Sequence, residues 1–307
     1  MDSERISPYR DLWFNDGNLV IQTGLALFRA HRGVLSVHAS VFRDMTTLPT
    51  PANQDMYEGV PLAVFPDDAN DMHHFLRALY FPDYFLPPPE RTSFDILEGV
   101  LRLAHKYDVP TLCRRALKHL AIACVTDVDK ITDEANFDRS YSVGPSDIGS
   151  ALKAEIALAR EVQALWLLPI LFLSMGLRKR DDYVDADVWM GKARSISPED
   201  AIASLFAYKA ATGSKKMNAF LRQLCHYGEC AREDTSINED DVALVRRMPI
   251  TAFDKYVKWT SDLCAQCKSE IHEEYRQEKE RIWGLLPATA GLPPWDELLE
   301  MKELDIG

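Results

Sequence analysis

The strand signals of this sequence are concentrated in its first 65 residues, and they nearly vanish from Cys124 on. Two short β-prone runs, residues 19–22 and 26–30, are separated by a Thr-Gly pair, which is typical of a β-hairpin. A third run covers residues 62–65, and beyond it the apolar residues recur every three or four positions, which predicts helices. The sequence therefore predicts an α+β fold, in which a unit of short strands and helices precedes an all-α C-terminal region.

Helical spacing also predicts the helices that accompany these strands. One short helix carries Phe42 and Met45 on its apolar side. A longer helix follows the Asp67-Asp68 pair, either member of which can act as its N-cap. Two further helices are expected from about Ser93 and from Pro110, a residue that suits the first helical position.

Four separated motifs accompany this order of elements. They are Asp16-Gly17-Asn18-Leu19-Val20-Ile21-Gln22, Phe28-x-x-His31-x-x-x-Leu35, Ser40-Val41-Phe42-Arg43-Asp44-Met45 and Leu101-x-x-Ala104-His105-Lys106-Tyr107-Asp108-Val109-x-x-Leu112. In this order they resemble the BTB/POZ fold over roughly residues 8–122. The chain looks closest to the BTB proteins abundant in mushroom-forming fungi, whose Glu-Gly-x-Pro pattern matches residues 58–61 and whose C-terminal region is helical.

The resemblance implies a module without catalytic chemistry, which self-associates or docks a cullin scaffold or a transcriptional corepressor. Many such modules dimerise through a helix before the first strand, but residues 8–14 are too short and proline-marked to form a long one. Cullin-binding members often carry a hydrophobic-x-Glu triplet, which Met56-Tyr57-Glu58 matches. Two functions stay open: a non-enzymatic adaptor or self-associating regulator, and a substrate adaptor of a cullin-type ubiquitin ligase.

Protein partners are thus expected to bind the N-terminal unit. The residues predicted to contact them are Phe42, Met45, Met56, Glu58, Phe81 and Phe85. The last two belong to an aromatic, proline-rich loop at 81–89, which can alternatively fold back on the core. His31 is expected to fix the corner where the second strand enters a helix, because no acid or nucleophile lies near it in sequence. His105 and Tyr107 are expected to be packing residues at a helix end.

The second half of the chain reads as a separate helical domain. We predict domains at 1–124 and 125–307, joined by the polar segment 126–147. A helix is expected at 146–168, with Pro169 restarting it, and the acidic stretch 181–187 is expected to be a solvated loop. Another helix is expected to begin at Ser197-Pro198, with the serine as N-cap.

Four of the six cysteines lie between positions 225 and 267. Cys225-x4-Cys230 and Cys264-x2-Cys267 form two close pairs, the usual arrangement for a tetrahedral structural zinc site. The alternative is buried thiols, because Cys264 and Cys267 also fall on the apolar stripe of a long helix expected over 253–275. A redox role lacks the strand-to-helix junction that such a motif requires.

Charge and motif content exclude several other functions. Acidic residues outnumber basic ones by 47 to 35, and the net charge of −12 argues against binding nucleic-acid phosphates or an anionic membrane. The most apolar stretch, 165–173, is too short to span a bilayer, and no signal segment opens the sequence. The sequence has no phosphate-binding loop, Gly-x-Ser-x-Gly or His-Glu-x-x-His motif, so we expect no enzyme, although an uncharacterised one is the alternative. An intracellular location, cytoplasmic or nuclear, is expected.

Overall fold

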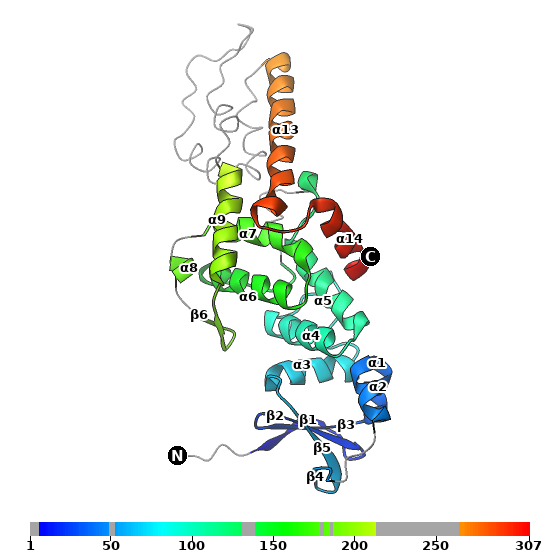
Figure 1. Cartoon of the computed structure of the whole chain (residues 1–307). Helices are drawn as coiled ribbons and strands as arrows, with labels where there is room; N and C mark the ends of the chain where they lie inside the picture. The colour runs from blue at the N-terminus through cyan, green and yellow to red at the C-terminus, as the bar shows by residue number, and fades with distance from the viewer. Residues whose placement is uncertain (1–5, 49–52, 131–138, 179–180, 185–186, 213–263) are drawn as a thin grey trace. The chain divides into compact units, whose positions relative to one another are not determined.

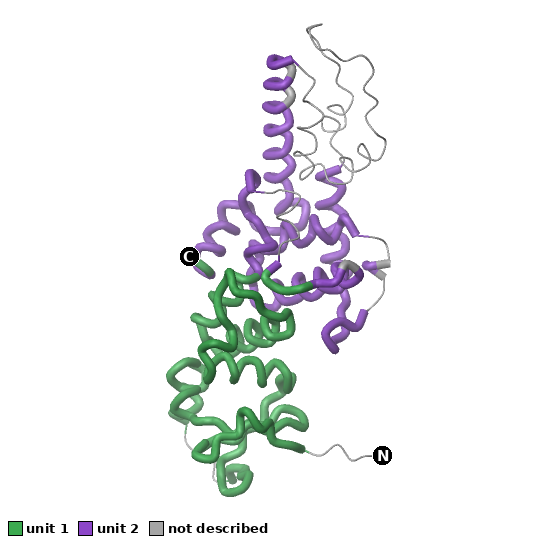
Figure 2. Tube along the Cα trace, turned by 180° about the vertical axis from the view of Figure 1, so that it is seen from behind, with its two compact units in different colours: residues 1–119, 140–142, 306 green, residues 120–139, 143–305, 307 purple. Residues whose placement is uncertain are grey.

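The computed structural model describes residues 6–48, 53–130, 139–178, 181–184, 187–212 and 264–307. It divides into two compact units (Figure 2). Unit 1 consists of residues 1–119, 140–142 and 306, and unit 2 of residues 120–139, 143–305 and 307.

Unit 1 contains a five-stranded mixed sheet (Figure 1). Its strands are β1 (Ser7–Trp13), β2 (Leu19–Thr23), β3 (Ala26–Ala30), β4 (Met56–Tyr57) and β5 (Val60–Phe65). They lie in the order β1-β3-β2-β5-β4. Strands β2 and β3 pair antiparallel with Ile21 opposite Phe28, and β2 pairs parallel with β5 with Ile21 opposite Ala63. The predicted hairpin and third strand are therefore confirmed.

The two edge strands were not predicted. β1 pairs parallel with β3, but its register is irregular between Pro8 and Trp13, and Leu12 is its one buried residue. A strand with this little burial has no complete apolar alternation to reveal it. β4 pairs antiparallel with β5 through two residues only, which is too short for any periodic pattern.

Five helices accompany the strands of the N-terminal region, two of them between β3 and β4 and three after β5. They are α1 (Arg32–His38), α2 (Ser40–Thr47), α3 (Ala69–Tyr80), α4 (Phe94–Lys106) and α5 (Pro110–Ala123). Asp68 caps α3, as expected, because its carboxylate accepts hydrogen bonds from the backbone N–H groups of Asn70 and Asp71 at 2.9 and 3.1 Å. The core of unit 1 is formed by fully buried aromatic and aliphatic side chains, including Phe28, Leu35, Phe75, Phe94, Leu97 and Leu101.

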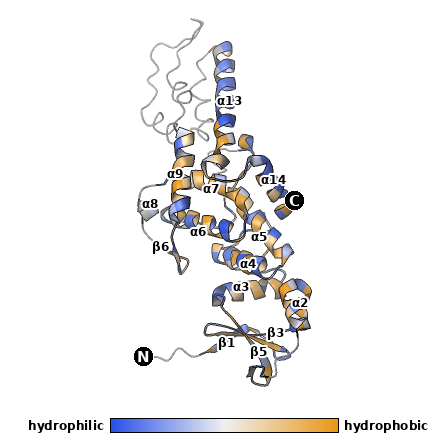
Figure 3. Ribbon diagram, in the orientation of Figure 1, coloured by the Kyte–Doolittle hydropathy of each residue, from blue (hydrophilic) through white to orange (hydrophobic). Residues whose placement is uncertain are grey.

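Unit 2 is mainly helical (Figure 1). Its described elements are the 3-10 turns η1 (Val128–Lys130), η2 (Pro145–Asp147) and η3 (Leu165–Leu167), the helices α6 (Ile148–Glu161), α7 (Leu168–Gly176), α8 (Asp181–Val184), α9 (Pro198–Thr212), α13 (Ala265–Thr289) and α14 (Trp295–Ile306), and the strands β6 (Asp187–Trp189) and β7 (Lys192–Arg194). Figure 3 shows the apolar character of α7, almost all of whose side chains are buried. No described helix is both long and apolar enough to cross a membrane.

Two predictions for unit 2 need correction. The helix expected over 146–168 is broken, because Gln163 adopts a left-handed conformation (φ 59°) between α6 and α7. Pro169 lies in the first turn of α7, as expected. The acidic stretch 181–187 is not a plain loop, since it contains α8 and the start of the β6–β7 hairpin. Asp187 anchors this hairpin through an ion pair with the fully buried Lys153 at 2.8 Å.

Two tryptophans join the last two helices, α13 and α14. Trp283 on α13 and Trp295 on α14 stack with ring centroids 4.5 Å apart, and the indole N–H of Trp295 donates to the carbonyl of Trp283 at 2.8 Å. At the other end of α13, Cys264 is the N-cap residue in an extended conformation. The long helix expected over 253–275 therefore does not run through Cys264, which stands at a helix start.

Candidate protein-binding surface

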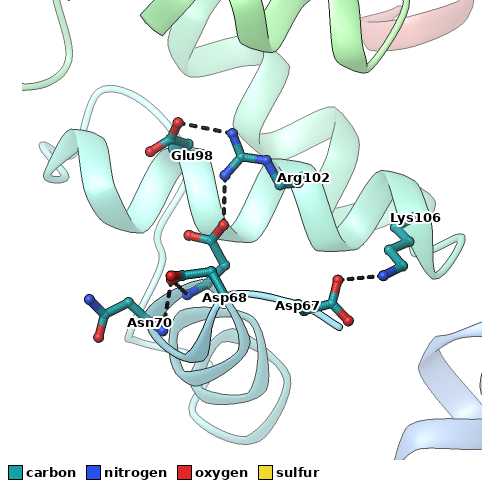
Figure 4. Close-up of polar contacts among 7 residues, drawn as sticks. Asp67, Asp68, Asn70, Glu98, Arg102 and Lys106 are labelled. Carbon is teal, nitrogen blue, oxygen red and sulfur yellow. Dashed lines mark hydrogen bonds and ion pairs between the residues drawn. The ribbon is translucent and has the colours of Figure 1, made fainter. Parts of the chain in front are cut away.

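A buried polar network holds α3 against α4 in unit 1 (Figure 4). The guanidinium of Arg102 donates to Asp71 at 2.6 Å and to Glu98 at 3.0 Å. Both carboxylates are almost fully buried, at 2% and 1% exposure of the whole residues. Gly99 allows this close approach, because a Cβ atom at that position would lie 2.9 Å from the Cα of Asp71. Such a buried polar network makes the packing of α3 against α4 rigid.

The loop between β5 and α3 is tied to the same helix. Asp67 forms an ion pair with Lys106 at 2.5 Å and accepts a hydrogen bond from the hydroxyl of Tyr107 (Figure 4 shows the first). Tyr107 is buried, as expected, and burial raises the pKa of its hydroxyl, which therefore stays protonated. His105 is exposed and is not a packing residue, contrary to expectation.

The β4–β5 turn presents two of the predicted contact residues. Met56 is 54% exposed, and Glu58 is also exposed. Glu58 and Gly59 both have positive φ angles, 48° and 77°, between the paired residues Tyr57 and Val60. A two-residue hairpin loop of this kind favours Asn-Gly, so a glutamate there holds an uncommon backbone conformation. The β4–β5 hairpin thus exposes an apolar side chain on strand β4 and an acidic side chain on the constrained turn.

Helix α2 supplies one of its two predicted contact residues. Met45 is 41% exposed, whereas Phe42 is only 3% exposed and packs against the rings of Phe65 and Tyr107. Phe42 is therefore a core residue that a partner cannot reach. The most exposed apolar residues of unit 1 were not predicted as contacts, namely Val37, Leu48 and Val64. For Val64, the continuous apolar run of β5 contains no polar residue to mark its outer face.

The aromatic loop 81–89 folds back on the core at Phe85, which is 1% exposed. The backbone carbonyl of Phe85 accepts a hydrogen bond from Arg115, and that of Leu86 accepts one from His119 at 2.8 Å. Burial lowers the pKa of His119, so its imidazole stays neutral and donates through Nε2. The prediction that Phe85 contacts a partner is therefore wrong. At this residue the loop folds back on the core, which was the alternative prediction.

Phe81 and Leu86 of the same loop stay exposed, at 38% and 40%. The guanidinium of Arg77 lies 4.2 Å from the ring centroid of Tyr84, whose hydroxyl is 2.6 Å from Nδ1 of His74. These contacts fix the loop, so Phe81 is presented from an ordered segment.

His31 has side-chain partners that support a structural role. Its backbone N–H donates to the hydroxyl of Tyr80 at 2.8 Å, and its Nε2 lies 3.2 Å from a carboxylate oxygen of Asp16. Its hydrogen bond lowers the pKa of the exposed Asp16 carboxyl. His31 thus joins the start of α1 to the end of α3 and to the turn before β2.

The predicted zinc ligands lie mostly outside the described residues. This holds for Cys225 and Cys230, and for the side chain of Cys267, whereas Cys264 is partly exposed before α13. Among the side chains that are described, no group of three or more His, Cys, Asp or Glu residues is arranged to hold a metal ion. The zinc site stays a prediction.

Most of unit 1 matches a known protein family. The family model of the BTB/POZ domain matches residues 14–121, which include the strands β2 to β5 and most of α5. A search of curated proteins finds no match to the chain. BTB/POZ domains are generally protein–protein interaction modules and are not typically catalytic. The N-terminal part of this protein is therefore a BTB/POZ domain, and a helical region follows it.

Proposed function

We propose that this protein is a non-enzymatic, intracellular adaptor or scaffold whose BTB/POZ domain binds a protein partner through the β4–β5 turn and the exposed side of α2. The observation that carries the proposal is the exposure of Met56 on strand β4 beside Glu58, which holds a positive φ in the turn that follows. Uncommon backbone conformations persist where the surrounding structure fixes them, and they cluster at functional positions. Exposed Met45 provides a further apolar contact on α2.

A cullin is the partner class that the same turn favours. The segment Met56-Tyr57-Glu58 has the hydrophobic-x-Glu form of cullin-binding BTB proteins, and both its outer residues are exposed. This supports the role of a substrate adaptor in a cullin-type ubiquitin ligase. If no cullin binds, the function that we propose is a self-associating regulator or scaffold.

The first prediction concerns this partner. The full chain should capture a cullin in a pull-down, and the double variant Met56→Ala/Glu58→Ala should lose at least about tenfold in affinity, because an exposed apolar anchor and a charge are removed together. The double variant Leu25→Ala/Glu90→Ala is a matched control, since it removes one exposed apolar and one exposed acidic residue elsewhere in unit 1. If wild-type protein captures no cullin, the ligase function is rejected. If both variants bind like wild type, the turn is not the contact surface.

The cysteines carry a second prediction, that Cys225, Cys230, Cys264 and Cys267 bind one structural zinc ion. Cys264 is the N-cap residue of α13 and is partly exposed, three positions before Cys267. Protein purified without chelator should contain about one zinc ion per chain by mass spectrometry, because a closed structural site is nearly full. Cys264→Ser should lower that content, whereas Cys113→Ser on α5 should not. A content below about 0.2 zinc per chain would favour buried thiols instead.

A further inference from the structure

Helix α9 (Pro198–Thr212) of unit 2 packs through its small residues. Ala203, Ser204, Ala207 and Ala211 are buried. At the contact with α7, a Cβ atom on Gly176 would lie 2.5 Å from the carbonyl oxygen of Ser204 and 2.6 Å from the Cβ of Tyr208. The two helix backbones therefore approach closely. Small residues on the packed side leave the large side chains of α9 on the opposite side.

The exposed residues of α9 form one stripe, in which apolar residues lie between an acidic and a basic residue. Its exposed residues after Pro198 are Glu199, Ile202, Leu205, Phe206 and Lys209. The three apolar ones are 52–53% exposed, although helices normally turn such residues inward. An acidic residue lies at one end of the stripe and a basic residue at the other. Neither Glu199 nor Lys209 has an ion-pair partner within the part of the chain that the structure describes.

The stripe is complementary to itself in the antiparallel direction. Glu199 lies five residues before Ser204 and Lys209 five residues after it, while Ile202 and Phe206 lie two residues on either side. A two-fold axis at the level of Ser204 would therefore place each glutamate opposite a lysine and each isoleucine opposite a phenylalanine. Leu205 of each copy would lie near the axis. Isologous contacts of this kind are the commonest in homo-oligomers.

We propose that the exposed face of α9 binds the same face of a second copy of this chain, with the two α9 helices antiparallel. Charge complementarity selects this occupant, because a second copy supplies both opposite charges at matching spacing. One helix face is smaller than a standard interface, so the association is weak, with a Kd on the order of 10–100 µM. The contact adds a second point of self-association, separate from any that the BTB/POZ domain makes.

Charge reversal tests the proposal in the full chain. Glu199→Lys places two lysine pairs in the interface and Lys209→Glu places two glutamate pairs, so each variant alone should associate about tenfold more weakly than wild type. Mixing the two variants restores both opposite-charge pairs. Sedimentation velocity at several concentrations near the Kd should therefore give a higher average mass for the 1:1 mixture than for either variant alone.

The same series separates this contact from association through unit 1. Self-association by the BTB/POZ domain would give the same mass for wild type, both variants and their mixture, and that result would overturn the α9 proposal. A monomeric wild-type chain at all concentrations would also overturn it. Phe206→Glu, which buries a charge in the apolar centre, should abolish the association that the mixture restores, and full retention of association in this variant would count against the antiparallel pairing.

Discussion

Replacing Arg102 by methionine should destabilise unit 1 by about 3–5 kcal/mol. The guanidinium of Arg102 forms ion pairs with Asp71 and Glu98 at 2.6 and 3.0 Å, and both acidic residues are almost fully buried. Methionine keeps most of the side-chain volume but leaves two acidic groups close together in the interior. Removing one partner of a buried ion pair leaves the other charge in the interior, which destabilises the fold strongly. The loss of unfolding free energy should therefore exceed that caused by breaking an exposed ion pair.

Urea unfolding followed by circular dichroism measures this effect, with the transitions of the two units fitted separately. The control is Arg276→Met on α13, because Arg276 pairs with Glu273 and Glu280 at the surface, where solvent screens the ion pairs, so its loss should have a much smaller effect. Adding Asp71→Asn and Glu98→Gln to the Arg102 variant should recover part of the stability, since both buried charges are then removed. A loss below about 1 kcal/mol for Arg102→Met would contradict the assigned role of this network.

Replacing Gly176 by alanine should destabilise unit 2 by about 2–3 kcal/mol. In an exposed helix the same change is favourable, because alanine has the higher helix propensity. Here the added methyl group would overlap the carbonyl oxygen of Ser204 and the Cβ of Tyr208, so α7 and α9 must move apart. The cost of this overpacking outweighs the gain in propensity.

Gly284→Ala is the matched control for this change. Gly284 lies inside α13, and a Cβ at that position meets no atom within 4 Å among the described residues. Alanine there should stabilise unit 2 by about 0.5–1 kcal/mol. Thermal unfolding of both variants should thus shift in opposite directions. Equal shifts of the two unfolding temperatures would show that the close α7–α9 contact does not prevent a larger residue at position 176.

The sequence predicts the local features of this fold better than its surfaces. Asp68 caps α3, and the hydroxyl of Ser197 accepts the backbone N–H of Asp200 at 3.1 Å at the start of α9, because such caps depend on neighbouring residues only. Strand β1 depends instead on β3, a distant partner in sequence, and it buries one side chain. Its pairing therefore leaves no periodic signal.

The candidate contact residues were predicted from a family triplet and from residue type, and neither determines exposure. Met56 lies on the surface in the short edge strand β4, and Glu58 lies on the surface in the two-residue turn that follows it. Phe42 and Phe85 are apolar like Met56, but they are buried. Phe42 packs against Phe65 and Tyr107, and Phe85 packs against His119. Those neighbours come from distant parts of the chain, so their packing could not be derived from local spacing.

Lys153 has a chemical consequence that follows from its burial. Its side chain has no solvent exposure, and its ammonium donates to Asp187 at 2.8 Å, so reagents that modify amines cannot reach it in folded unit 2. Acylation of this lysine requires a local opening of unit 2 that exposes its ammonium and separates it from Asp187. The rate of its modification therefore reports the frequency of that local opening, independently of global unfolding.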